Sequence, residues 1–287
     1  MDFIKLGTIA AAIAKKDNPA AIVAINRALL GETGVNWIRD LTSLASFLKT
    51  GKPAFIINSY RGNSKLPFMA FSALPGKSFC PGAGDCLKQC FSFKSWRNPG
   101  AFCRQAQNTV LLGTKAGQQI IKLDFQRIIR MRKYNNSPIF RLYVDGDFQN
   151  ISDVRFWFNL LSENSGVRAY GYTKSFHQVL AYAKNNALPY NYKLNVSAGH
   201  KHKKVTVNKI KALSITRGDF VYIPMDHIIP AGISGHSRAQ IQKEFIKTTG
   251  KKAFVCPGDC GNCVKVKNVK SHFCGSDNKT PIVIAMH

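Results

Sequence analysis

Four cysteines near the C-terminus have a spacing that is typical of metal-binding and iron–sulfur sites. Cys256, Cys260 and Cys263 form a C-x3-C-x2-C pattern, and Cys274 follows eleven residues later. Proline and glycine between the first three predict a tight loop in which the sulfurs can converge. Thiolates in such a loop bind zinc or an iron–sulfur cluster. We therefore expect a metal-bearing knuckle here, placed between two short strands.

The remaining cysteines form a second group with irregular spacing: Cys80, Cys86, Cys90 and Cys103. Structural zinc favours pairs of C-x2-C motifs, and only Cys260 and Cys263 have that spacing. A cuboidal cluster suits the irregular spacing better, because its four irons lie at separated corners. Residues 80–85 are rich in glycine, which leaves their backbone amides available to donate hydrogen bonds to sulfur. We expect one or two 4Fe–4S clusters on the eight cysteines, with zinc, or one cluster shared by both groups, as alternatives.

The cellular surroundings of these cysteines are expected to be reducing. Residues 1–10 lack the basic region that precedes the apolar part of a secretory signal. No run approaches the ~20 apolar residues that a membrane span requires. We therefore expect a cytoplasmic protein, in the host cytosol if a phage or plasmid encodes it, where clustered thiols bind metal rather than form disulfides.

The charge of the chain favours a polyanionic partner. Forty-one Lys and Arg against 15 Asp and Glu give a net charge of +26 at pH 7. We expect nucleic acid, DNA rather than RNA, and no membrane partner; a merely solvated basic surface is the alternative. Aromatic side chains among the basic ones would stack on bases or pack beneath the cysteine loops. The candidate contacts are Lys88, Lys94, Trp96, Arg97, Arg104, Lys201, Lys203, Lys204, Lys265, Lys267 and Lys270.

The elements that must position these residues alternate between helical and strand-like patterns. The expected strands cover residues 54–58, 68–72, 139–144, 167–172, 192–196, 220–223, 253–255 and 280–286. The expected helices cover 36–49, 101–134 with a break near Gly113 or Gly117, 152–162, 176–185, 205–213 and 237–248. Single helices between successive strands predict a parallel α/β sheet, and their repetition favours a partial or complete barrel over a doubly wound sheet.

The chain is expected to have two parts. Residues 1–52 have helical periodicity and form an N-terminal helical segment. Residues 53–287 form the barrel-like domain, with cysteine loops at 80–103 and 256–274.

Polar residues follow the expected strands, where barrels place their chemistry. Asp145 and Asp147 follow one strand and Lys174 follows the next. As catalytic candidates, the two aspartates would act as a general base or hydrogen-bond a ligand, and Lys174 would bind an anion. Alternatively, the aspartates cap the next helix and Lys174 forms an ion pair with one of them. His200 and His202 are expected to belong to a basic loop rather than to bind metal.

Several of these motifs together resemble the gene product 88 family of phages. They are Gly146-Asp147-Phe148 at a strand end, Tyr170-Gly171-Tyr172-Thr173-Lys174 one helix later, and the Cys-Pro pairs at Cys80 and Cys256. The likeness covers residues 54–287. The chain has Asp145 where the family pattern has serine, so no family role carries over to that position. The resemblance implies a mobile-element protein whose barrel is related to those of radical enzymes.

Two functions are consistent with these observations. The first is a nucleic-acid-binding iron–sulfur protein of a phage or plasmid, with a role in DNA replication or its regulation. The alternative is a metal-dependent or radical S-adenosylmethionine-like enzyme that modifies nucleic acid or nucleotides. The C-x3-C-x2-C spacing is the one that radical S-adenosylmethionine enzymes use for a cluster with three cysteine ligands. Here Cys274 would be a fourth ligand and would occupy the iron that those enzymes leave without a cysteine.

Overall fold

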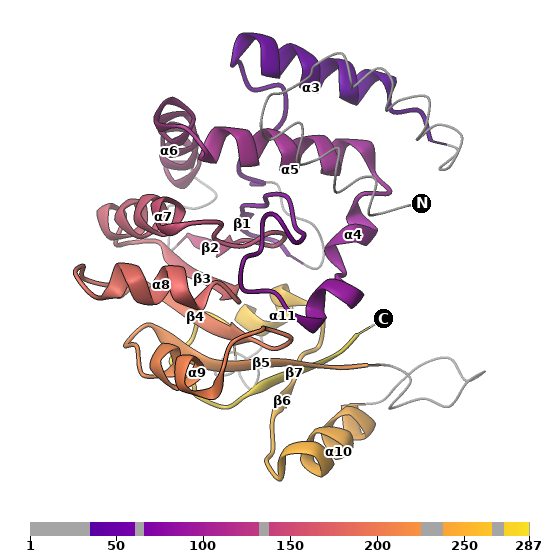
Figure 1. The fold of residues 1–287 in the computed structure, drawn as a ribbon, viewed down its shortest axis with the longest axis vertical. Coiled ribbons are helices and arrows are strands. Elements are labelled where there is room, and N and C mark those ends of the chain that lie inside the picture. Colours follow the sequence, from indigo (N-terminus) through magenta and orange to yellow (C-terminus); the bar gives the residue numbers. More distant parts are fainter. Residues whose placement is uncertain (1–34, 61–65, 132–137, 225–237, 266–272, 287) are drawn as a thin grey trace.

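The computed structural model describes residues 35–60, 66–131, 138–224, 238–265 and 273–286. These residues build a seven-stranded sheet in the order β1-β2-β3-β4-β5-β7-β6, in which every pairing is parallel. The sheet curls into an open half-barrel (Figure 1). The strands are β1 Met69–Ala70, β2 Ile139–Leu142, β3 Arg168–Thr173, β4 Tyr192–Ser197, β5 Thr216–Pro224, β6 Phe254–Val255 and β7 Ile282–Met286. The predicted α/β class with a partial barrel is confirmed.

Helices cover the outer side of this sheet. Helices α6 to α9 follow one another along that side, while α3 and α5 lie beyond the β1 edge and α10 lies beside β6 (Figure 1). The helices are α3 Ile38–Thr50, α4 Ser92–Ser95, α5 Pro99–Leu112, α6 Lys115–Ile129, α7 Ile151–Glu163, α8 Phe176–Ala183, α9 Lys204–Lys211, α10 Arg238–Thr249 and α11 Cys260–Lys265, with a 3-10 turn η1 at Asp85–Gln89. None of the described helices is long and apolar enough to cross a bilayer.

Local sequence accounts for the helix boundaries. The side chain of Asn98 accepts a hydrogen bond from Ala101 N at the start of α5, and Pro99 occupies the first helical position. The long helical stretch predicted from residue 101 breaks at Gly113, as expected, and Thr114 caps the next helix through Gly117 N. The predicted helix 36–49 is α3, which packs against α5. The helices expected before residue 35 lie outside the described residues.

Alternation along the strands gives the sheet two different faces. On the outer face, Phe140 and Ala169 join the main hydrophobic core beneath the helices, where Trp157 packs against Phe71 with ring centroids 4.7 Å apart. On the inner face, Tyr170 belongs to a second cluster that contains Phe273, Cys263 and Cys274. The strand pattern therefore separates an apolar packing face from a cysteine-bearing one.

The strand predicted over residues 54–58 is wrong. The buried side chain of Gln107, on α5, takes the place of a neighbouring strand. Its Oε1 accepts hydrogen bonds from Ala54 N and Phe55 N, at 2.7 and 2.9 Å, and its Nε2 donates to Phe55 O at 2.9 Å. Because these backbone groups are satisfied by a side chain, the apolar segment packs as an extended loop.

Candidate metal centre

The four C-terminal cysteines come together on the inner face of the sheet. We call Cys256, Cys260, Cys263 and Cys274 the C-terminal quartet. Cys256 follows β6, Cys260 and Cys263 lie on the short helix α11, and Cys274 lies before β7. The loop predicted around Cys260 is thus partly helical, which places two of the sulfurs one turn apart on one side of α11.

Burial and mutual repulsion act on the thiols of the quartet. Burial is the larger cause and raises the pKa of Cys263 and of Cys274 to about 12; the proximity of Cys256 and Cys260 adds to both shifts. The pKa of Cys256 is also raised, again mainly by burial and then by Cys260. Because Cys256 and Cys260 act on the thiols of their neighbours in this way, the quartet lies close together, and a metal would have to displace protons to bind.

Hydrogen-bond donors approach the sulfurs of the quartet. Tyr172 Oη donates to Cys274 Sγ at 2.8 Å, and Tyr170 Oη lies 3.9 Å from Cys260 Sγ. Gly258 N donates to Cys256 Sγ at 3.5 Å. Hydrogen bonds to sulfur stabilise thiolates and the clusters that they bind.

Two arginines place positive charge beside the quartet. Arg141 lies in β2 with a buried Nε that has no hydrogen-bond partner, and its guanidinium lies 5.0 Å from the centre of the Tyr172 ring. Burial acts to lower the pKa of Arg141, but the acidic groups of Tyr172, Tyr170, Cys260 and Cys274 together raise it. Arg217 is 1% exposed and donates to the carbonyl oxygens of Phe273 and Thr280. Cations in this position favour negative charge on the quartet.

The described residues do not support the metal loops that the sequence predicts. Within the described ranges, no group of three or more His, Cys, Asp and Glu side chains is placed to hold one metal ion. Zinc requires all its sulfurs about 2.3 Å from one point.

Three of the four upstream cysteines lie together over the C-terminal ends of the strands. We call Cys80, Cys86 and Cys90 the upstream trio. Burial raises the pKa of Cys80 and of Cys90; Asp147 and then Cys90 add to the shift of Cys80, and Cys86 adds to that of Cys90.

The loop of the trio is held by the loop that follows β4. Gly84 N and Cys86 N both donate to Gly199 O, at 2.9 and 3.2 Å, and Lys201 N donates to Gly82 O at 3.1 Å. Gly199 has φ +73°, and a Cβ there would lie 2.8 Å from Cys86 Cβ, so only glycine fits.

Cys103 is separate from the trio. It is fully buried on α5 in the main core, beside Phe102. Burial raises its pKa, with Asp40 of α3 as the additional cause, and no thiol of the described residues contributes. The upstream quartet expected from the sequence is therefore a trio plus one core cysteine.

The predicted catalytic aspartates make structural hydrogen bonds. Asp147 is 4% exposed and accepts from Thr173 Oγ1 at 2.6 Å, Lys174 N at 2.7 Å and Phe148 N at 2.8 Å. Asp145 is 7% exposed and accepts from Ser72 and Gln105 side chains. Burial raises the pKa of both carboxyls, and their hydrogen bonds partly offset the shift. This arrangement favours a role in joining strand ends over a role as a free base.

The alternative roles predicted for these residues, a helix cap for the aspartates and an ion pair for Lys174, are wrong. Asn150, not an aspartate, caps α7. Lys174 Nζ donates to Ser197 Oγ at 2.8 Å, and the described residues contain no ion pair between Lys174 and either aspartate.

The predicted nucleic-acid contacts divide into exposed and buried groups. Trp96 is fully buried and its Nε1 donates to Gln105 Oε1, so the expectation that it stacks on a base is wrong. Arg104 is half-buried, and burial lowers its pKa while nearby Asp145 raises it. Lys88 pairs with Asp85 at 3.1 Å. The exposed candidates are Lys88, Arg97, Lys201, Lys203, Lys204 and Lys265; the side chain of Lys94 is not described, and Lys267 and Lys270 lie outside the described residues.

Sequence reasoning missed the groups that surround the quartet. Tyr170 and Tyr172 alternate on β3 and so share the inner face. Arg141 lies between Phe140 and Leu142 in an apolar strand. A cation at such a position is a detectable signal, because a buried charge needs a partner.

Comparison with known proteins adds a family relationship. A family model described as Gene product 88 matches residues 46–274, which contain all eight cysteines and end before β7. No curated protein and no solved structure matches the chain.

Proposed function

The chain belongs to the gene product 88 family, and we propose that it is an iron–sulfur protein that binds nucleic acid. The observation that carries the proposal is the C-terminal quartet: four cysteines gathered on the inner face of the sheet, with tyrosine hydroxyls and two guanidinium groups beside them. The quartet would hold one 4Fe–4S cluster. When bound, such a cluster supplies a group that accepts and releases single electrons.

The residues around the quartet fit a four-iron cluster in charge. A cluster with four thiolate ligands carries net negative charge, which Arg141 and Arg217 can balance in a partly buried site. Each sulfur binds its own iron, so the sulfurs need not meet at one point. Zinc would need that single point.

The nucleic-acid part of the proposal is supported by the excess of basic residues. The net charge of +26 favours binding to phosphates through the release of counterions. Exposed lysines at positions 201, 203 and 204 adjoin the loop that holds the upstream trio. Nucleic acid bound at these lysines would therefore lie close to the loop of the upstream trio.

The cluster is tested by replacing Cys256 and Cys260 together with serine. Protein purified without oxygen is expected to lose about four irons per chain and their visible absorption, because two of four cluster ligands are gone. The matched control is Cys103→Ala, which removes a core thiol and is expected to leave the iron content unchanged. Unchanged iron in the double variant, or zinc in place of iron in the wild type, would refute the cluster on the quartet.

A second candidate function is enzymatic, and the separation of Cys103 from the upstream trio favours it. Three thiols bind three corners of a four-iron cluster and leave the fourth iron open to a small molecule. The trio lies near Lys174 and Ser197 at the C-terminal strand ends, where α/β barrels carry out chemistry. S-adenosylmethionine is the ligand that this hypothesis predicts.

This second function has its own measurement. Wild-type protein would then contain about eight irons, and Cys80→Ala with Cys86→Ala would remove about four of them and abolish binding of S-adenosylmethionine. Equilibrium dialysis with S-adenosylmethionine, beside iron analysis, gives both values. If the wild type holds about four irons and loses all of them in the Cys256 and Cys260 variant, the enzymatic hypothesis fails and the cluster on the quartet stands.

A further inference from the structure

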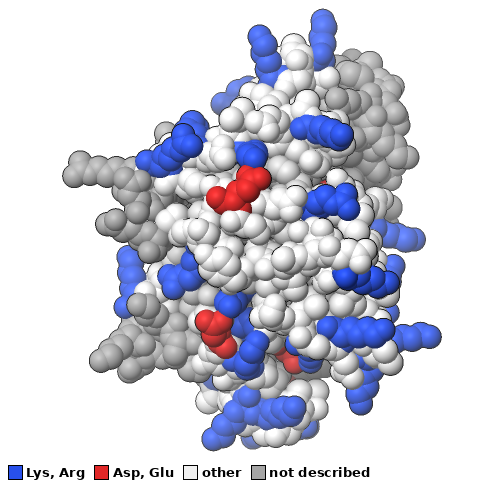
Figure 2. Space-filling model, turned by 90° about the vertical axis from the view of Figure 1, so that its left-hand side faces the viewer, with Lys and Arg blue, Asp and Glu red and all other residues white. Residues whose placement is uncertain are grey.

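Helices α6 to α9 form a strongly basic surface, which we call the helical face. Figure 2 shows this side of the molecule, where Lys and Arg are far more numerous than Asp and Glu. The helices lie side by side along the sheet (Figure 1), and α7, α8 and α9 pack against one another in that order. Packed helices lie roughly 8–10 Å apart, so the face extends for about 30 Å, the length of about nine base pairs.

The acids of the helical face are already neutralised or buried. Glu163 pairs with Lys122 at 2.6 Å, and Asp124 pairs with Arg127 at 2.7 Å. Asp153 is 2% exposed. The cations that remain are exposed and take part in no ion pair within the described residues: Lys115, Arg155, Lys184, Lys203, Lys204 and Lys209. The face therefore has positive charge that the described part of the chain does not balance.

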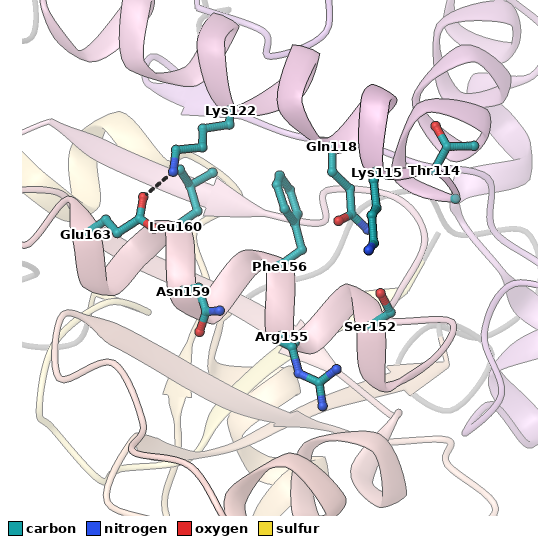
Figure 3. A pocket seen from close by; sticks show the side chains of 11 residues that line it. Thr114, Lys115, Gln118, Lys122, Ser152, Arg155, Phe156, Asn159, Leu160 and Glu163 are labelled. Carbon is teal, nitrogen blue, oxygen red and sulfur yellow. Dashed lines mark ion pairs between the residues drawn. The ribbon is translucent and has the colours of Figure 1, made fainter.

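The helical face also contains a groove, which lies between α6 and α7. It has a volume of about 400 Å³ and is lined by polar side chains of both helices. Lys115 and Gln118 reach from α6 towards α7, and Phe156 rises from α7 between the helices (Figure 3). Arg155 and Asn159 also line it. Its size is that of a small-molecule pocket and would admit a sugar–phosphate unit.

The face is suited to phosphates rather than to bases. All Phe, Tyr and Trp side chains of α6 to α9 are buried or half-buried, which leaves the imidazole of His177 as the exposed ring of these helices and gives the face little surface on which a base could stack. Lysine and arginine without stacking partners bind the backbone of a duplex with little dependence on sequence.

We propose that the helical face binds the sugar–phosphate backbone of double-stranded nucleic acid, with the groove between α6 and α7 receiving one phosphate. This deepens the proposed function, on whose nucleic-acid part it rests, by assigning the contact surface. It places that surface on the outer helices, where it includes Lys203 and Lys204 of the predicted contacts but none of the basic residues within the cysteine loops.

Two variants with the same loss of charge test the assignment. The face variant carries Lys115→Gln, Arg155→Gln, Lys204→Gln and Lys209→Gln. The control variant carries Lys243→Gln, Lys247→Gln, Lys251→Gln and Lys252→Gln, all exposed positions on α10 or just after it. Binding of a labelled duplex of about 20 base pairs is measured by fluorescence anisotropy over a series of salt concentrations.

The face variant is expected to bind about tenfold or more weakly, and the slope of log K against log salt should fall by about 3 to 4, or about 0.9 per lost contact. The control should keep most of the affinity and the slope. Equal weakening of both variants would overturn the assignment, because net charge alone would then explain binding. If the wild type binds no duplex, the nucleic-acid part of the proposed function fails instead. If it binds vesicles of anionic lipid but not the duplex, the face contacts membranes and the assignment also fails.

Discussion

Replacing Gly82 by alanine is expected to detach the loop of the upstream trio from the sheet. A Cβ at this position would overlap the backbone carbonyl of Lys174 and would lie 2.8 Å from His202 Nε2. The carbonyl belongs to the backbone and cannot rotate away as a side chain can, so the loop must move. We expect a loss of about 3 kcal/mol in the free energy of unfolding, at the upper end of the range for overpacking.

Urea denaturation and alkylation of the metal-free, reduced protein measure the two consequences of this change. Cys80 and Cys86 should react faster with a thiol reagent in the Gly82→Ala variant, as mass spectrometry of the labelled peptides would show. The matched control is Gly166→Ala, since Gly166 follows α7 and has open space around its Cα. Identical midpoints and identical labelling in the two variants would mean that the loop does not dock on Lys174 after β3 and His202 after β4.

Replacing Arg141 by methionine is expected to lower the reduction potential of the proposed cluster. Reduction adds negative charge, and the guanidinium beside Cys260 and Cys274 favours that charge. Methionine keeps the apolar stem and removes the cation. We expect a shift of the order of 60 mV to more negative values, which is tenfold in the equilibrium constant of a one-electron step.

A redox titration followed by electron paramagnetic resonance measures this shift. Arg155→Met is the control, because it removes the same charge from the exposed side of α7. A potential that moves equally in both variants would assign the effect to net charge. A potential that does not move in the Arg141 variant would show that this arginine does not balance the charge of a cluster.

Most of the fold could be predicted from the sequence because its elements are long and regular. The strands and helices between residues 139 and 255 follow the expected alternation, and Gly113 marks the break between α5 and α6. The failure at residues 54–58 has a tertiary cause, since a remote glutamine satisfies the backbone there. The position of β7 between β5 and β6 is also a long-range property that no local pattern contains.

The candidate site was predictable in part for related reasons. The spacing of the C-terminal quartet identifies residues that do lie together. Counting alone placed Cys103 with the trio, although Cys103, Ala106 and Val110 are spaced as one face of a buried helix. Helical periodicity and cysteine spacing gave opposite indications for Cys103, and in the structure it lies in the core. Lys203 and Lys204 of the helical face are among the contacts that the sequence predicts, whereas Lys115, Arg155, Lys184 and Lys209 are far apart in the sequence and come together only in the fold.

The place of β7 in the sheet has a consequence for the order in which the protein matures. Within the described residues, β6 pairs only with β7, and β7 is formed by residues 282–286. Cys256, which follows β6 and donates its backbone N–H to Val283 O, is therefore joined to the sheet only after residues 282–286 have been synthesised. The C-terminal quartet would therefore assemble only when β7 is in place. A protein truncated before residue 282 would keep all eight cysteines but lack the strand against which β6 and Cys256 pair.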